Sequence, residues 1–442
     1  MKLAVLCLVP EVGHVLPLVR IAMEARKDGH DILFCVPEEI AKLVKEYAFQ
    51  VHSFGKVFPP YSEKLLTQIS GTTPLTRKLI YNRLFELHYF QPLQRNVYDQ
   101  LDKVETSVRA FDPHLLIADD LLFSGTVCAI ASDFGVPVIL HQVTGSNQPC
   151  QHVQPYVGRA WKLQQPFVRF ISQVCGYIEN KLTWAFKRPE WERRNQQISA
   201  LQEYWKETAT RKNALPSEAI HHVTSGLGVL EAKYLRDHIE VCQNIQLLGP
   251  LPPQKVVVSI PERVTQWMEA QKDKPIIFVS FGTMVSLSER QVYTIISAAK
   301  ELDINLLWAS KTNTLGSNAG QNSHVLWAPW LPQPAILAHP AIKGFVSHAG
   351  SGAMQEALWY AQPLLCLPQL RDQPYNAWVA EKLGFGISID KPKISKSRIL
   401  RSLRILLNDE ELRKRSRQLS EEIRLQNGSD RIRSIIMEAI KL

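Results

Sequence analysis

Short apolar runs alternate along the chain with longer stretches in which apolar positions recur every three or four residues. Residues 2–9 form one run, the helical spacing then covers 15–25 and stops at Gly29, and a second run follows at 31–36. A short continuous apolar run is typical of a strand buried on both faces, and the intervening spacing predicts an amphipathic helix. This stretch therefore predicts a strand–helix–strand unit with parallel strands.

The same alternation returns twice further along the chain. Each return predicts two more buried parallel strands with a helix between them, which makes the fold class α/β. Between these returns, the sequence LLGPLPP at 247–253 marks a stiff, turn-rich connection, because two consecutive prolines end regular structure. The predicted strands are 115–118, 136–140, 275–281 and 305–309, and the predicted helices are 124–134 and 289–302.

Two stretches interrupt the alternation. Residues 56–105 are partly amphipathic, and residues 155–215 are rich in aromatic and basic side chains, with eight Arg or Lys against three Glu over 158–194. One interpretation is a solvated helical excursion that caps the sheet. The other is an acceptor-binding wall, or a basic aromatic surface at 158–194 that makes peripheral contact with a membrane.

Composition narrows the class of protein. With 45% hydrophobic and 21% charged residues, the chain is typical of a globular protein and not of a disordered or fibrous one. No apolar run reaches the ~18–20 residues that a membrane helix needs. The apolar start lacks a small-residue cleavage site, so we expect a first strand there and a cytoplasmic location. A net charge of +9 permits contact with phosphates, but no nucleic-acid motif accompanies it, so no nucleic-acid partner is expected.

The second half of the chain contains a candidate anion site. The sequence KGFVSHAGSGAMQEAL at 343–358 runs from an apolar strand through small residues into a helix. Small residues let a backbone approach a phosphate, the helix start can bind the anion, and His348 could donate to it. A tight turn at Gly350 and Gly352 without any ligand explains the same spacing equally well. The pattern is not the three-glycine dinucleotide fingerprint.

A wider set of residues resembles the signature box of the UDP-dependent glycosyltransferase family, glycosyltransferase family 1. The box runs without a gap over 44 positions, from Trp330 to Gln373. Its small-residue version at 351–353 looks like the bacterial branch that glycosylates macrolides and similar natural products. The matching residues are Trp330-Leu331-Pro332-Gln333, His339-Pro340, Phe345, His348-Ala349-Gly350, Glu356, Pro363, Pro368 and Asp372-Gln373.

The resemblance implies an architecture. The fold would be GT-B, with two facing Rossmann-like, doubly wound domains and a cleft between them. The N-terminal domain, 1–250, would bind the acceptor, and a linker would cover 251–265. The nucleotide-sugar domain would be 266–415, and a C-terminal helix over 416–442 would pack back on the first domain.

The resemblance also implies contacts along the donor. Trp330 would stack on the uracil face, which is worth about 1–3 kcal/mol for an aromatic ring on a base. Gln333 and Glu356 would hydrogen-bond the ribose hydroxyls, and a carboxylate suits two hydroxyl donors. Asp372 and Gln373 would bind hydroxyls of the transferred sugar.

The diphosphate would lie on the strand-to-helix turn. Plant members carry Trp-Asn-Ser at 351–353, so a hydroxyl is missing here at 353. Ser351 or backbone groups would replace that contact. The Trp-x-Pro-Gln sequence favours UDP, with glucose as the expected sugar. The implied phosphate residues are His348, Gly350, Ser351, Gly352 and Ala353, with Gly282 and Thr283 on a nearby loop.

The first half of the chain supplies the candidate base. Gly13-His14-x-x-Pro17 follows the first strand and resembles a family segment whose His is catalytic. An imidazole titrates near neutrality, as deprotonation of an attacking hydroxyl requires, and a carboxylate can orient it. Asp119, after the strand at 115–118, is the expected partner, and Asp120 is the alternative. Either Asp could instead cap the next helix.

The predicted function is an inverting transfer of a sugar from a UDP-sugar donor to a hydroxyl of a hydrophobic small-molecule or lipid-like acceptor. No metal or cofactor is expected, because no acidic pair resembling a metal-binding Asp-x-Asp stands in the cleft segments. Two alternatives share this fold. One is a sugar-nucleotide epimerase, and the other is a non-catalytic nucleotide-sugar-binding subunit.

Overall fold

The computed structural model describes most of the two halves of the chain. The described residues are 1–58, 91–120, 123–143, 215–236, 245–253, 259–282, 287–310, 324–369 and 372–441. The basic aromatic stretch at 158–194, most of 56–105 and 155–215, and Thr283 lie outside them.

The N-terminal half forms a parallel sheet in the order β3-β2-β1-β4-β5-β6-β7. The predicted apolar runs supply its central strands, and β4 is buried along its whole length. The strands are β1 (Lys2–Leu6), β2 (Asp31–Val36), β3 (Gln50–Ser53), β4 (Leu115–Asp119), β5 (Val138–Gln142), β6 (Ile220–Thr224) and β7 (Gln246–Leu247).

Alternate residues of these strands point to opposite faces of the sheet and so serve two cores. Leu3 and Val5 pack with α1 and α2, whereas Ala4 and Leu6 pack with α5, α6 and α7. The helices are α1 (Val12–Lys27), α2 (Glu38–Lys45), α5 (Gln91–Tyr98), α6 (Leu101–Phe111), α7 (Ser124–Phe134) and α10 (Gly228–Tyr234).

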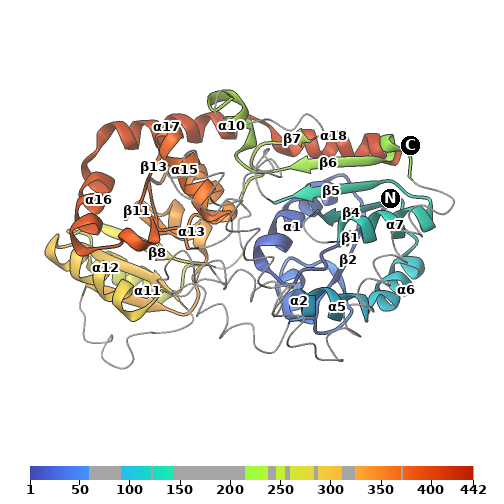
Figure 1. The fold of residues 1–442 in the computed structure, drawn as a ribbon, viewed down its shortest axis with the longest axis horizontal. Helices are drawn as coiled ribbons and strands as arrows, with labels where there is room; N and C mark the ends of the chain where they lie inside the picture. Colours follow the sequence, from blue (N-terminus) through green and yellow to red (C-terminus); the bar gives the residue numbers. More distant parts are fainter. Residues whose placement is uncertain are drawn as a thin grey trace, which may run out of the picture.

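The C-terminal half repeats this arrangement in a second parallel sheet, ordered β10-β9-β8-β11-β12-β13. Its strands are β8 (Ile276–Ser280), β9 (Asn305–Ala309), β10 (Val325–Ala328), β11 (Ile342–Ser347), β12 (Leu364–Cys366) and β13 (Gly386–Ser388). Its helices are α11 (Glu262–Ala270), α12 (Glu289–Glu301), α13 (Gln333–Ala338), α14 (Ser351–Trp359), α15 (Gln373–Leu383), α16 (Lys396–Asn408) and α17 (Glu410–Arg424). Figure 1 shows the two domains side by side.

A helix from each half of the chain packs on the domain formed by the other half, so the predicted domain boundaries need correction. The predicted single helix at 416–442 is two helices, because the chain turns at Asn427, whose φ is 52°. Helix α17 packs on α14 of the C-terminal domain, and α18 (Gly428–Ile440) packs on α1 of the N-terminal domain. Figure 1 shows these two helices in line across both domains.

The predicted end of the N-terminal domain at 250 and the predicted linker at 251–265 also differ from the structure. Leu227 and Leu230, at the start of α10, belong to the C-terminal core, because their apolar side chains pack there and not on their own sheet. The helix α11 already begins at Glu262, and Val264 is buried in the same core. No helix in the described part of the chain is long and apolar enough to cross a membrane.

The contact of β13 with α15 generates a prediction about stability. A Cβ atom on Gly386 would lie 2.8 Å from Ala380 Cβ and 3.2 Å from the Leu364 backbone oxygen. We expect Gly386→Ala to cost about 1–3 kcal/mol of unfolding free energy, because a backbone atom cannot give way to the methyl group. Chemical denaturation of the purified protein measures this cost.

Gly125→Ala is the matched control, because no atom lies within 4 Å of a Cβ built at Gly125. Its midpoint should not fall and should rise slightly, because alanine is favoured over glycine at an exposed helix position. Equal midpoints for the two variants would contradict the tight contact at Gly386.

Candidate functional site

The side chains of His14 and Asp119 meet at the carboxyl ends of two neighbouring strands. His14 lies in the first turn of α1, after β1, and Asp119 ends β4, which pairs with β1. His14 Nδ1 is 2.9 Å from Asp119 Oδ1, and both side chains are buried. If Nδ1 carries the proton that it donates to the carboxylate, Nε2 presents a lone pair. The arrangement can therefore accept a proton at Nε2 and stabilise the resulting cation through Asp119.

Glu11 is a neighbour of this pair that the sequence pattern did not single out. Its Oε2 lies 3.6 Å from His14 Nε2, one helical turn before the imidazole. Asp120, the alternative partner, lies elsewhere: its Oδ2 is 3.4 Å from His222 Nδ1, and this contact raises the pKa of His222. Of the two candidate aspartates, Asp119 is thus the one that contacts His14 in the structure.

His141 lies directly beside Asp119 in the sheet, because the two residues are register partners of β5 and β4. Its Nε2 is 2.8 Å from Ser225 Oγ, and its side chain is fully buried. Burial lowers the pKa of His141 to about 4, so the imidazole is neutral at pH 7. The sequence offered no signal for this residue, because a His inside an apolar strand has no distinctive spacing.

In the second domain, the turn between β11 and α14 is held in an unusual backbone conformation. Ala349 has φ 63°, in the left-handed region that costs a non-glycine residue about 1–2 kcal/mol. Its carbonyl accepts a hydrogen bond from Asn376 Nδ2 at 2.9 Å. The same Nδ2 group donates to Asp372 Oδ2 at 2.7 Å. Asn376, which the sequence analysis missed, therefore ties the turn to α15.

The ring of His348 fits between two glycines. A Cβ on Gly350 would lie 2.5 Å from His348 Nε2, and one on Gly282 would lie 3.0 Å from Cε1. Any larger residue at these positions would displace the imidazole. Burial lowers the pKa of His348 to about 4, so the group is a neutral hydrogen-bonding partner and not a cation at pH 7.

Residues 350–353 form the start of α14. Gly350 is its N-cap, and a Cβ on Gly352 would meet no atom within 4 Å. Ser351 Oγ donates to the Val143 carbonyl at 2.9 Å, so this hydroxyl bonds across to the N-terminal half. Ala353 is buried in the C-terminal core. The open backbone at Gly352 suits the close approach of an anion to the helix start.

Glu356, one turn further along α14, gathers polar groups from two other helices. Its Oε2 accepts from Gln333 Nε2 of α13 at 2.8 Å. Its Oε1 accepts from Arg20 Nη2 of α1 at 2.5 Å. Trp330, just before α13, is 54% exposed, which is unusual for a large ring and leaves a flat apolar surface for a ligand.

The last two matched residues start α15. Asp372 is the N-cap of this helix, and Gln373 is its first residue. Gln373 Oε1 accepts from the Gln369 backbone N–H at 2.9 Å, which orients its amide. Thr283 cannot be placed, because it lies outside the described residues.

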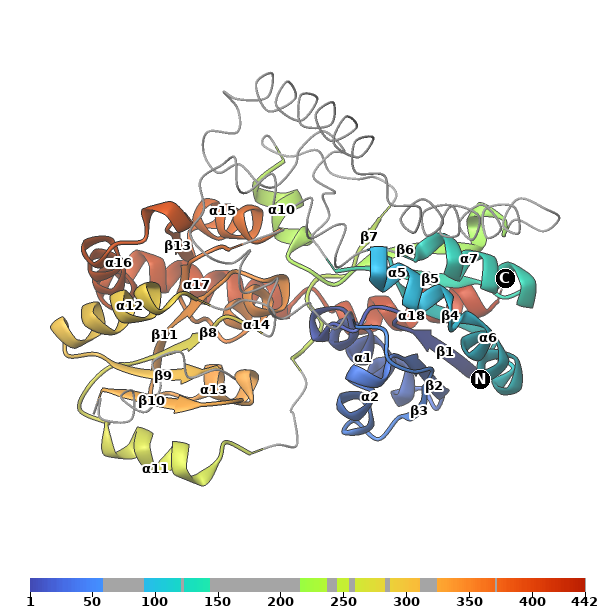
Figure 2. The same cartoon turned by 60° about the horizontal axis from the view of Figure 1, so that its bottom comes forward.

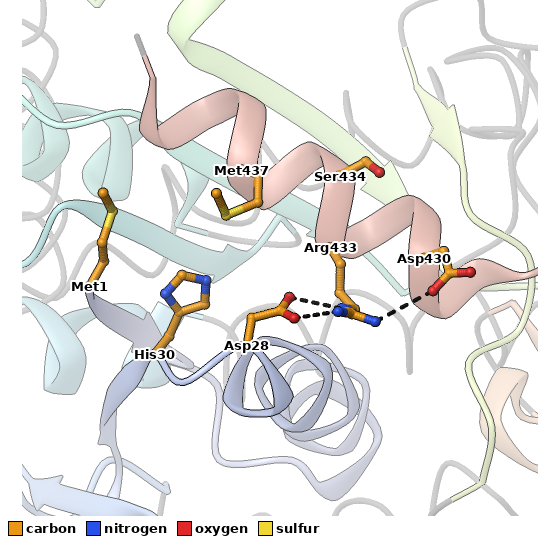
Figure 3. Close-up of a pocket in the computed structure, with 7 residues that line it drawn as sticks. All are labelled: Met1, Asp28, His30, Asp430, Arg433, Ser434 and Met437. Atoms are coloured by element: carbon orange, nitrogen blue, oxygen red, sulfur yellow. Dashed lines mark hydrogen bonds and ion pairs between the residues drawn. The ribbon is translucent and has the colours of Figure 1, made fainter.

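A pocket of about 720 Å³ lies away from these residues, between the end of α1 and α18. Figure 3 shows Asp28 and Arg433 joined there by an ion pair that fastens α18 to the N-terminal domain. Within the described ranges, no group of three or more His, Cys, Asp or Glu side chains is placed to hold a metal ion.

Comparison with known proteins gives a consistent picture. The profile of the family described as UDP-glucoronosyl and UDP-glucosyl transferase matches residues 198–425. A myricetin 3-O-rhamnosyltransferase from Crocosmia x crocosmiiflora is 30% identical over 182 residues, covering 37% of this chain and 39% of that protein. The mogroside IIIx synthase of Siraitia grosvenorii is 24% identical over 439 residues, covering 92% of this chain and 87% of that protein. Alignments with the first three curated relatives span 39%, 50% and 41% of those proteins' length.

A solved structure, the glycotransferase of kitacinnamycin, superposes with a TM-score of 0.69 and 18% identity over 99% of both chains. At this identity the likeness concerns the fold alone. It confirms the predicted GT-B architecture of two Rossmann-like domains.

The buried imidazole of His141 generates a prediction about pH. Its folded pKa of about 4 lies below the ordinary value of 6.5, so stability is fully present above pH 6.5 and is lost as the pH falls toward 4. His141→Asn should lose less stability than the unaltered protein between pH 7 and 4.5, by about 2–3 kcal/mol. Chemical denaturation at a series of pH values measures the difference.

His222→Gln is the control with the opposite sign. The pKa of His222 is raised by Asp120, so its contribution is present at low pH and lost as the pH rises. This variant should therefore lose more stability on acidification than the unaltered protein. An unchanged pH profile for His141→Asn would refute the assignment of a neutral buried imidazole.

Proposed function

The chain belongs to the UDP-glucoronosyl and UDP-glucosyl transferase family, and from this premise we propose that it transfers a sugar from a UDP-sugar to an acceptor hydroxyl. The observation that carries the proposal is the buried contact of His14 with Asp119, 2.9 Å long, at the carboxyl ends of β1 and β4. Ligands of open α/β sheets bind at such ends. A transfer between two substrates requires a base for the acceptor and a binding site for the donor. The N-terminal domain supplies the first, and the signature box of the C-terminal domain supplies the second.

The proposed chemistry is a single inverting displacement. His14 Nε2 takes the acceptor hydroxyl proton as the oxygen attacks the anomeric carbon. The bond from that carbon to the diphosphate oxygen breaks, and UDP leaves with the electron pair. Asp119 stabilises the imidazolium through Nδ1. Inversion follows because one attack from the face opposite the leaving group completes the transfer.

The donor contacts follow the signature box. The exposed ring of Trp330 would stack on uracil, and Gln333 with Glu356 would hold the ribose. The free N–H groups at the start of α14 would bind the diphosphate, with His348 as a neutral donor. The open backbone at Gly352 supports this placement, because it compensates in part for the hydroxyl that Ala353 lacks. No step of the proposal uses a metal ion.

We propose glucose as the transferred sugar and an apolar small molecule as the acceptor. The names of two relatives support a small-molecule acceptor with a hydroxyl group, since they specify myricetin and cyanidin-3-O-glucoside as acceptors of those enzymes. The acceptor wall predicted within 56–105 and 155–215 lies largely outside the described residues. A cytoplasmic location and a membrane contact through 158–194 stay predictions.

A UDP-release assay tests the proposed reaction. The purified protein is incubated with UDP-glucose and a panel of flavonoid, macrolide and lipid alcohols, and products are identified by mass. We expect UDP release that depends on the acceptor and a product heavier by one hexose. An epimerised UDP-sugar in the absence of any acceptor would favour the epimerase instead. Binding of UDP-glucose without turnover would favour the non-catalytic subunit.

The base assignment yields a separate prediction. His14→Ala should lower kcat by about 10²- to 10⁴-fold, because it removes the imidazole that takes the acceptor proton as the bond forms. The affinity for UDP should change by less than about twofold, since the imidazole lies on the acceptor side. Steady-state kinetics and titration calorimetry with UDP measure the two quantities.

Asp119→Asn and Asp120→Asn form a matched pair for the same assay. The first should lower kcat strongly, because an amide cannot stabilise the imidazolium as a carboxylate does. The second should keep near-normal kcat, because Asp120 contacts His222 instead. Near-normal turnover of His14→Ala would exclude His14 as the base.

A further inference from the structure

A buried ion pair joins the two domains at the candidate ribose site. Arg20 Nη2 lies 2.5 Å from Glu356 Oε1, and the two side chains are each 8% exposed. The residues stand 336 positions apart in the chain. Arg20 belongs to α1 and lies six residues after His14 on the same helix. In Figure 2, α1 and α14 lie at the junction of the two domains.

The two contacts leave hydrogen-bond acceptor positions on the carboxylate. A carboxylate has about four acceptor positions, two on each oxygen. Arg20 uses one on Oε1, and Gln333 uses one on Oε2. Among the contacts of the described residues, one position therefore remains on each oxygen, which matches the two hydroxyls of a ribose. The two protein groups also fix the plane of the carboxylate, so it need not be ordered when the ribose arrives.

Arg20 contributes a positive charge next to Glu356 in addition to its packing between the domains. A carboxylate buried without a cation tends to take up a proton, because burial disfavours the charged form. Tyr47 and Tyr360 face the pair, and burial raises the pKa of each phenol, so both are neutral. Arg424 faces Tyr360 from α17 but is bonded to the Trp359 carbonyl. The cation in direct contact with Glu356 is Arg20.

We propose that Arg20 is a positioning residue for the ribose of the donor. It orients the Glu356 carboxylate and balances its charge through a direct contact, so that recognition of the nucleotide by the C-terminal domain requires a side chain of the N-terminal domain. The proposal rests on the function proposed above, because it takes Glu356 as the ribose ligand. The opposite arrangement, in which Arg20 blocks the carboxylate and must leave, predicts the opposite effect of its removal.

The test compares UDP with 2′,3′-dideoxy-UDP, which lacks both ribose hydroxyls. Binding of each nucleotide is measured by titration calorimetry for the unaltered protein, Arg20→Met and Arg20→Lys. Met retains most of the apolar stem of Arg, so the interdomain packing is largely preserved. We expect the unaltered protein to prefer UDP by at least about tenfold, the scale of hydrogen bonds to a charged group.

In Arg20→Met, the affinity for UDP should fall about tenfold, while that for dideoxy-UDP should stay within about twofold. The KM for UDP-glucose should rise by a similar factor with little change in kcat, because the base is untouched. Arg20→Lys should restore part of the preference, since it returns the charge. Arg433→Met is the matched control: it removes an exposed ion pair to Asp28 at the end of α1 and should alter neither affinity.

The outcomes separate the two proposals. If Arg20→Met keeps the full preference for UDP, weakens both nucleotides equally or binds UDP more tightly, the positioning role is wrong while the proposed reaction stands. If the unaltered protein does not distinguish the two nucleotides, the ribose contact of Glu356 and the role of Arg20 both fail. Acceptor-dependent UDP release then decides the proposed function by itself.

Discussion

Parallel pairing of every strand in both sheets is the constraint on which the candidate site depends. Because parallel strands share a direction, their carboxyl ends gather at one edge, where each chain segment turns into a helix. His14 follows β1 and Asp119 ends β4, so pairing of these two strands is enough to bring an imidazole to a carboxylate 105 positions away. In the other sheet, the same rule places His348 after β11, next to Gly282 after β8.

The two domains are fastened by an exchange of helices. Leu227 and Leu230, at the start of α10, pack in the C-terminal core, whereas α18 packs on the N-terminal sheet through apolar residues such as Ile432. Tyr375 adds a hydrogen bond to Glu231 at 2.8 Å, between α15 and α10. Each exchanged helix buries apolar surface in a core that belongs to the other half of the chain. The relative position of the two halves therefore depends on side-chain packing as well as on the connecting chain.

Much of the fold could be predicted from periodicity, because strands buried on both faces leave continuous apolar runs. The predicted helix at 124–134 and strand at 305–309 coincide with α7 and β9. Boundaries set by tertiary contacts could not be predicted. The Asn427-Gly428 dipeptide within 416–442 is itself a turn signal that the predicted single helix overlooked, but nothing in this stretch indicates which domain each half packs against. Likewise, nothing in the apolar residues of α10 indicates that they pack in the C-terminal core.

The residues of the candidate site likewise include some that the sequence could predict and some that it could not. Gly350 and Glu356 are assigned through the resemblance of one continuous stretch to the family's signature box, and the structure places both in one turn and the helix that follows it. Arg20 could not be predicted, because a basic residue on an amphipathic helix is usually a solvated charge, and its partner lies in the other domain. A buried ion pair is weak evidence for stability, since desolvation offsets most of its attraction. The Arg20–Glu356 pair involves the carboxylate that the signature box assigns to the ribose, which indicates a role in binding the donor. The cation that contacts this carboxylate comes from α1, the helix that also carries the candidate base, so the donor site and the base share one element of the N-terminal domain.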